Sequence, residues 1–225
     1  MFSQVFLAVT AKELESVRPK QTAYMACHFS AGGPGLSNLP YFLPKNSILL
    51  LDDSMPVQDH DPKTVLAQLT ELIGKFSVRA VLLDFQRPPT EESRRMAAAI
   101  LQNCSCTAAA TPAYVKEGFP VFLPPPPVNK PLTEYLKPWK KVFLELASEA
   151  LEITVTKNGS RFSAVYPTSP LPLEDKRLHC HYSVKVFPGK AVFTLSRSRE
   201  DLAALAREAE KLGVLGVVGL YQDLQ

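Results

Sequence analysis

The apolar run at residues 78–86 (VRAVLLDFQ), which contains an aspartate near its end, limits the folds open to this chain more than any other stretch. Such a run is typical of a strand buried on both faces, as in a parallel sheet flanked by helices, where the carboxyl ends of the strands carry the chemistry. Because side chains alternate along a strand, Leu82, Asp84 and Gln86 share one face, which in a barrel is the interior mouth. Asp84 and Gln86 are therefore the first candidate site residues. The alternative is that Asp84 caps the following loop and Gln86 is merely solvated.

Strand-like and helix-like segments alternate along the rest of the chain. Apolar periodicity predicts helices at 11–18, 62–75, 91–102 and 200–212, and Asp61 followed by Pro62 is a favourable start for the second. Together with the central run, strands are predicted at 2–10, 22–29, 47–53, 78–85, 105–111, 119–123, 140–147 and 213–221. This order predicts an α/β fold, a (β/α)8 barrel of the TIM type, as a single domain over residues 1–225.

Proline makes this barrel irregular, because 20 of the 225 residues are proline and many fall in the connections after the second, fifth and sixth predicted strands. Few residues remain there for helices, so we expect gaps in the outer helical ring. Apolar barrel surface exposed at such gaps would favour a homo-oligomer. The tetraproline 124–127 must end the sixth strand and is either a rigid loop or a ligand for a proline-recognising module.

A small antiparallel insert is predicted between the seventh strand and the last helix, at about 151–195. Residues 151–157 and 161–166 flank Asn158–Gly159, which is a strong hairpin signal. Residues 179–187 and 191–195, joined by 188–190, predict a second hairpin.

Composition excludes several classes of function. The 25 basic and 22 acidic residues give a net charge of +3, and no Lys/Arg run is long enough for a nucleic-acid track. No stretch approaches the roughly 20 apolar residues of a membrane span, and the first ten residues do not resemble a signal peptide, so we expect a cytoplasmic protein without membrane contact. The glycine-rich loop 30–37 lacks the Lys-Ser/Thr ending of a phosphate-binding loop, and no cofactor is expected.

The cysteines and histidines could in principle bind zinc. His179 and His181 share one strand face, as do Cys104 and Cys106, but no Cys-x-x-Cys pair supports a metal site. Half-buried cysteines in strands are ordinarily packing residues. We therefore expect neither a metal nor a disulfide.

Three of these segments together resemble the family 18 glycoside hydrolases, that is, chitinases and their relatives, including short peptidoglycan-associated members of spore-forming bacteria. The Asp-x-x-Asp-x-Asp-x-Glu motif of the family's fourth strand falls on Arg79, Leu82, Asp84 and Gln86. Residues 140–150 are similar to the family's seventh strand. Residues 216–221 (GVVGLY) are similar to its closing strand, with Tyr221 at the position of a tryptophan.

The resemblance also implies a defect in catalysis. In the family, the aspartate at the position of Asp84 orients the substrate's own N-acetyl group as nucleophile, and the glutamate at the position of Gln86 protonates the glycosidic oxygen. The amide of Gln86 cannot donate that proton, and loss of a general acid typically costs ~10²–10⁴ in rate. The family's first two aspartates are replaced as well, and 124–127 stand where its sixth strand ends in Met-x-Tyr-Asp.

Two hypotheses follow. In the first, the chain is a catalytically degenerate barrel, not an enzyme, that binds a glycan-like or other polar ligand or a protein partner at its mouth. In the second, it is a glycoside hydrolase with a rebuilt carboxylate pair. A second inward carboxyl within about 5–10 Å of Asp84 would favour the enzyme. Asp52 and Asp53 both end the third strand, and alternation lets only one of them face inward. The candidate ligand-binding residues are Asp53, Tyr114 (as a stacking surface), Glu145, Glu149, Tyr221 and Asp223.

Overall fold

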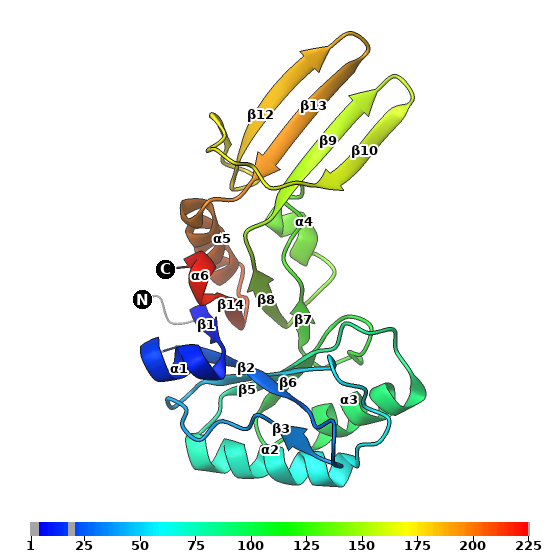
Figure 1. The fold of residues 1–225 in the computed structure, drawn as a ribbon, viewed down its shortest axis with the longest axis vertical. Helices are drawn as coiled ribbons and strands as arrows, with labels where there is room; N and C mark the ends of the chain where they lie inside the picture. Colours follow the sequence, from blue (N-terminus) through cyan, green and yellow to red (C-terminus); the bar gives the residue numbers. More distant parts are fainter. Residues whose placement is uncertain (1–4, 18–20, 225) are drawn as a thin grey trace.

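A computed structural model of the chain describes residues 5–17 and 21–224 and contains a closed barrel of eight parallel strands with an antiparallel sheet beyond it (Figure 1). The predicted α/β fold of the TIM type is therefore confirmed. The barrel strands are β1 (Val5–Val9), β2 (Thr22–Phe29), β4 (Ile48–Asp52), β5 (Ala80–Asp84), β6 (Thr107–Ala110), β7 (Val121–Leu123), β8 (Val142–Leu146) and β14 (Gly216–Leu220). The predicted strand start at 2–4 and the helix end at Arg18 lie outside the described residues.

The barrel closes because β1 pairs in parallel with both β14 and β2. The glycine-rich loop after β2 leads into the two-residue strand β3 (Leu36–Ser37), which turns back to pair antiparallel with β2. The register between β2 and β4 shifts between Tyr24 and Cys27. The glycine-rich loop thus belongs to the connection that follows the carboxyl end of β2.

The outer helices are incomplete. Four predicted helices are present: α1 (Ala11–Val17), α2 (Pro62–Phe76), α3 (Glu91–Asn103) and α5 (Arg199–Lys211). The carboxylate of Asp61 caps α2 by accepting the N–H groups of Lys63 and Thr64. Only the five-residue α4 (Leu132–Leu136) lies between β7 and β8, and no described helix lies between β6 and β7. The expected irregularity of the barrel is therefore confirmed.

Apolar side chains fill both sides of the barrel wall. The interior is filled by alternate residues of the strands, among them Phe6, Ile48, Leu50, Leu82, Phe122, Phe143 and Val218. The outward residues pack in two further clusters, one against α2 and α3 and the other against α5. Gly216 permits the tight interior packing, since a Cβ atom there would lie 3.0 Å from the Phe143 ring. The barrel is thus a packed core rather than a pore.

The insert is a five-stranded antiparallel sheet in the order β10-β9-β13-β12-β11. Both predicted hairpins form, as β9 (Ala150–Thr156) with β10 (Gly159–Ala164) and as β12 (Cys180–Phe187) with β13 (Lys190–Ser196). They join through β9 and β13, and β11 (Leu173–Asp175), which was not predicted, pairs with β12. Figure 1 shows the hairpin tips projecting away from the barrel.

The last strand ends one residue earlier than predicted. Tyr221, expected at the end of the strand, begins the short helix α6 (Tyr221–Leu224). None of the helices within residues 5–17 and 21–224 has both the length and the apolar composition of a membrane span.

Candidate functional site

Inside the barrel, the layer of side chains next to the apolar interior, at the carboxyl ends of the strands, contains carboxylates. Side-chain alternation carries each strand from an interior core residue to the next inward position, at the carboxyl end. Three of these positions are acidic: Asp52 after Leu50, Asp84 after Leu82 and Glu145 after Phe143. Asp52 and Asp84 are directly paired in the register of β4 and β5. We call these three residues the mouth carboxylates.

Asp84 and Gln86 interact with each other. The Gln86 amide nitrogen donates to both carboxylate oxygens of Asp84, at 3.1 Å each. Burial raises the pKa of Asp84, the hydrogen bond from Gln86 partly opposes that rise, and the charges of Asp52 and Asp53 add to it. The two candidates identified from the central strand therefore lie together, with Asp84 half-buried and Gln86 exposed.

The enzyme hypothesis requires a second carboxyl that faces the mouth together with Asp84, and Glu145 is such a carboxyl. It lies on β8, three strands from β5 around the barrel. Burial raises its pKa to about 7, and the charges of Asp84 and Glu149 contribute to the rise. A carboxyl with such a pKa is protonated in a useful fraction near neutral pH, as a general acid must be.

Asp53 does not face the mouth, so its assignment as a ligand-binding residue is not supported. Its side chain is buried, and its two carboxylate oxygens accept the backbone N–H groups of Gln86 (2.8 Å) and Arg87 (3.0 Å). Asp53 therefore shapes the loop after β5. Alternation selects Asp52 as the inward residue, a choice the sequence had left open.

Both candidate tyrosines contact the apolar cluster outside the barrel wall. Tyr114 is buried, its hydroxyl lies 3.2 Å from Ser93 Oγ and donates to the Arg87 carbonyl, and its ring packs edge-on against Phe85. Tyr221 packs against the outer cluster that includes α2 and α3. Tyr114 is therefore unsuited as a stacking surface, whereas the half-buried Tyr221 stays a predicted ligand-binding residue.

The acidic residues beyond β8 and β14 have separate places. Asp223 on α6 accepts the backbone N–H of Ser148 at 3.2 Å, which fastens the C-terminal helix to the end of β8. Glu149 is half-buried where the chain enters the insert, and burial raises its pKa while the charge of Arg197 opposes the rise. Only Glu149 of this pair influences the mouth, through its effect on Glu145.

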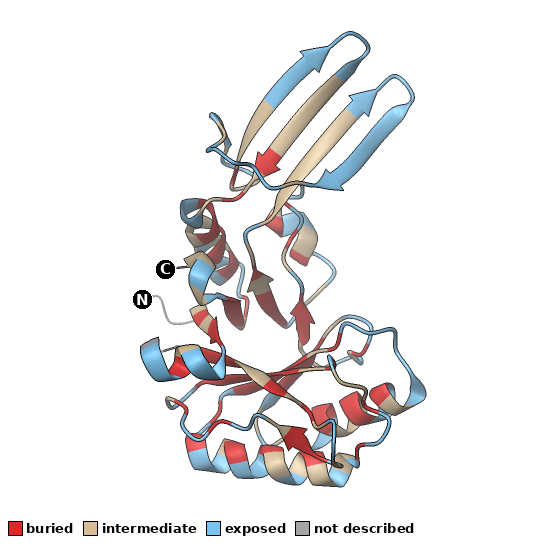
Figure 2. Cartoon of the chain, viewed as in Figure 1, coloured by how far each residue is buried: buried red, intermediate tan, exposed pale blue. Residues whose placement is uncertain are grey.

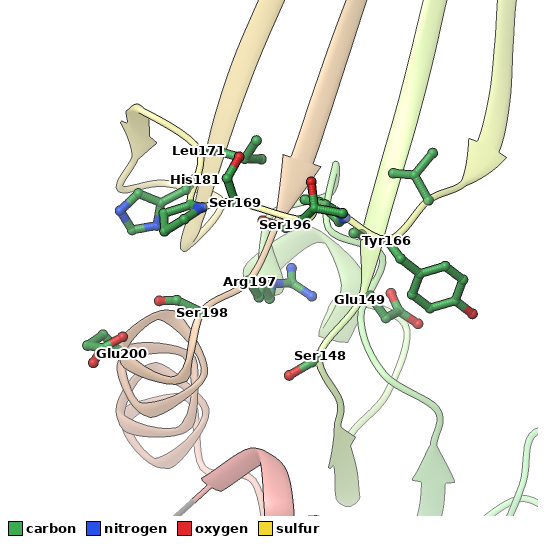
Figure 3. A pocket seen from close by; sticks show the side chains of 15 residues that line it. Ser148, Glu149, Tyr166, Ser169, Leu171, His181, Ser196, Arg197, Ser198 and Glu200 are labelled. Carbon is green, nitrogen blue, oxygen red and sulfur yellow. The ribbon is translucent and has the colours of Figure 1, made fainter.

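A pocket of about 650 Å³ lies at the base of the insert. Figure 3 shows Arg197 in the middle of its wall, with Glu149 and Tyr166 on one side and His181 and Glu200 on the other. Its lining residues include none of the mouth carboxylates. Volume alone would favour this pocket as the site, but the convergent acidic groups of perturbed pKa lie inside the barrel, and we give these more weight.

Arg197 lines this pocket, and the sequence did not reveal its role. Its guanidinium is buried and donates to the carbonyl oxygens of Pro126, Pro127 and Leu178. It thereby binds the tetraproline segment to the insert, which supports the rigid-loop interpretation of that segment. The position carries no local motif, since it is a single arginine between two serines.

The cysteines and histidines that were candidates for zinc do not share partners. Cys104 Sγ lies 3.7 Å from Cys106 Sγ, whereas His179 and His181 each lie against a carboxylate of α5, Glu208 (2.6 Å) and Asp201 (2.8 Å). Among the residues that the structure describes, no group of three or more His, Cys, Asp or Glu side chains could hold a metal ion.

Comparison with known proteins gives a likeness in fold and not in sequence. No family model matches the chain, and no curated protein matches it significantly. The spore cortex-lytic enzyme SleL of Bacillus cereus superimposes over 99% of this chain and 71% of its own, with a TM-score of 0.59 and 11% identity. A glycoside hydrolase family 18 N-acetylglucosaminidase from Paenibacillus barengoltzii superimposes over 98% of this chain and 97% of its own (TM-score 0.57, 9% identity). A chitinase from Chromobacterium violaceum covers 96% and 93% (TM-score 0.55, 8% identity). The barrel with its insert therefore has the fold of family 18 glycoside hydrolases, as the strand motifs predicted.

Proposed function

We propose that this chain is a catalytically degenerate barrel of the glycoside hydrolase family 18 fold that binds an N-acetylated glycan at its carboxyl-end mouth. The observation that carries the proposal is the convergence of Asp52, Asp84 and Glu145 inside the mouth. Crowding carboxylates in a half-buried site destabilises the folded state, and titratable groups with perturbed pKa values that converge in this way are typical of functional sites. Sugar hydroxyl and acetamide N–H groups are donors that such acceptors bind. The choice of an N-acetylated glycan rests on the solved structures of the same fold.

The absence of turnover follows from Gln86. It occupies the position of the family's proton donor and holds Asp84 by hydrogen bonds. Arg79 and Leu82 stand where the family has its first two aspartates, so Asp84 lacks the neighbouring carboxylates with which it would share a proton during turnover. We therefore expect Gln86→Glu alone to leave turnover undetectable.

Calorimetry with N-acetylglucosamine oligomers and N-acetylated peptidoglycan fragments tests the binding. Wild type should bind, and Asp84→Asn should weaken binding at least tenfold. Glu71→Gln, on the exposed side of α2, is the matched control and should bind as wild type does. Equal binding by wild type and Asp84→Asn would mean that the glycan does not bind at the mouth.

One observation favours a second candidate, hydrolysis through a rebuilt carboxylate pair. Glu145, with a pKa of about 7, has the property of a general acid, and its pKa responds to the charge of Asp84. In this case wild type hydrolyses a fluorogenic N-acetylglucosamine oligomer, and the rate falls as pH rises through about 7 and Glu145 loses its proton. Both Glu145→Gln and Asp84→Asn should then abolish turnover. Robust wild-type hydrolysis with this pattern would replace the degenerate-barrel proposal.

A further inference from the structure

Two thiols meet at the amino end of the barrel, opposite the mouth. The sulfur atoms of Cys104 and Cys106 lie 3.7 Å apart, and both side chains are half-buried, whereas Ser105 between them is exposed. The sequence predicted a strand from Ser105, in which the cysteines would be packing residues. The strand β6 instead begins at Thr107, and residues 104–106 form a bend that turns the two thiols toward each other. The bend continues from the carboxyl end of α3, a helix that keeps an exposed side (Figure 2), so solvent reaches the pair in part.

The other two cysteines differ from this pair in exposure and in acidity. Cys27 and Cys180 are fully buried, and burial raises the pKa of Cys27 to about 12 and that of Cys180 to about 11. A buried, neutral thiol is an inert packing residue. The same chain therefore contains two cysteines of the inert kind, with which Cys104 and Cys106 can be compared.

Hydrogen bonds around Cys104 favour its thiolate. The thiol of Cys106 donates to the Cys104 sulfur and lowers the pKa of Cys104; burial opposes this effect, and the backbone N–H groups of Cys106 and Ser105 add to it. The same contact raises the pKa of Cys106, which keeps its proton. The partial negative charge at the carboxyl end of α3 opposes a thiolate, so these donors are what stabilises it. Cys104 is thus suited to attack, and Cys106 lies within reach to complete a reaction.

We propose that Cys104 and Cys106 are a redox-active dithiol that exchanges with small disulfides of the glutathione type. The Cys104 thiolate attacks one sulfur of the small disulfide, whose S–S bond breaks, and the first small thiolate leaves and takes up a proton. Cys106 then loses its proton and attacks the Cys104 sulfur, which breaks the mixed disulfide and releases the second small thiol. Two electrons pass from the dithiol to the small disulfide, which becomes two thiols. Once Cys104 is in the mixed disulfide, it no longer accepts the proton of Cys106, so the main cause of the raised pKa of Cys106 is removed.

The bend can accommodate the new bond. Residues two apart lie within about 7 Å of each other even in an extended chain, and a disulfide requires Cα atoms closer than about 7 Å. The sulfurs must approach from 3.7 Å to about 2.0 Å. A loop this small constrains the unfolded chain little, so the bond adds little stability. A partly exposed disulfide is also open to attack by thiols. The bond is therefore exchangeable rather than structural.

The reduced full chain, incubated with oxidised glutathione and quenched in acid, tests the proposal by mass spectrometry of its peptides. Wild type should lose two hydrogen atoms as a disulfide between Cys104 and Cys106, and an excess of reduced glutathione should restore the dithiol. In Cys106→Ser, which keeps a donor beside Cys104, the mixed disulfide of Cys104 with glutathione should accumulate. In Cys104→Ser, the remaining Cys106 should react about tenfold more slowly than Cys104 does in Cys106→Ser.

Two controls separate reactivity from general exposure. Ser105→Ala keeps both thiols and the backbone N–H groups, so it should react as wild type does. Cys27 and Cys180 should stay reduced in the folded chain and become reactive in concentrated urea.

Four outcomes would overturn the proposal. A wild type that stays reduced, or that keeps glutathione on Cys104, would show that the pair does not complete the exchange. A disulfide that links two chains would show that Cys106 is not the resolving thiol. Equal rates in Cys104→Ser and Cys106→Ser would remove the assigned roles. Oxidation of Cys27 and Cys180 in the folded chain as fast as that of Cys104 would show that the pair has no special reactivity.

Discussion

The barrel and the insert are built from similar strands and differ in how their apolar sides are covered. In the barrel, closure and the outer helices bury both sides of the wall, and the interior strand positions are almost inaccessible to solvent. In the insert, one side of the sheet is covered only at its base. The comparison shows that strand pairing and side-chain alternation can be complete in a region whose apolar surface remains unburied.

Truncation of a core aromatic gives the largest contrast. Phe143→Ala empties the barrel interior beside Gly216 and should lower the free energy of unfolding by about 3–5 kcal/mol. Val186→Ala at the insert tip should change the stability of the monomer by less than about 0.5 kcal/mol. Urea denaturation measures both. Similar losses for the two variants would mean that the insert is as fully packed as the barrel.

Removal of the buried arginine tests the connection between the two regions. Arg197→Met leaves the carbonyl oxygens of Pro126 and Pro127 without a donor and should cost about 2–3 kcal/mol, mainly within the insert. Hydrogen exchange should become faster in β9, β12 and β13 and stay unchanged in the barrel strands. The control is Arg177→Met, which breaks the exposed pair with Glu134 and should cost at most about 1 kcal/mol. Uniform acceleration across the chain would show that the insert and barrel unfold as one unit.

The smallest effect on stability is expected at the mouth, where the barrel holds carboxylates instead of apolar side chains. Folding raises the pKa of Glu145 from 4.5 to about 7, so the folded state binds this proton more tightly than the unfolded state. Stability is then lost as pH rises from about 4.5 to about 7. Glu145→Gln removes that loss and should stabilise the protein by about 1–3 kcal/mol at pH 8 and by almost nothing at pH 4. Thermal unfolding across this range measures the difference, with Glu71→Gln as the control. A pH-independent effect would contradict a raised pKa.

Local patterns were sufficient to predict most of the fold. The run at 78–86, the helix start at Asp61 and the turn at Asn158–Gly159 each act through neighbouring residues, and all three have the structure their chemistry predicts. The short β11 and α4 were missed because they have too few residues for a period to be recognised.

The site was predicted less completely because it depends on which side of the barrel wall a residue occupies. Which of Asp52 and Asp53 faces the barrel interior depends on the side-chain alternation at the end of β4. Because the two aspartates are consecutive, the sequence alone does not show which one faces inward. Tyr114 was assigned to the mouth for its aromatic ring, but its hydroxyl finds partners in Ser93 and Arg87 that are distant in sequence. Long-range partners of this kind have no local signal.

The pairing of β1 with β14 has a consequence for synthesis of the chain. Val5 pairs with Val217, so β1 leaves the ribosome long before its neighbour exists, and one strand edge stays open during most of translation. The insert hairpins are local and can form while the barrel is still incomplete. An open edge of this kind can pair with other chains. Nascent or truncated chains that lack β14 should therefore be the species that aggregates and that molecular chaperones must protect.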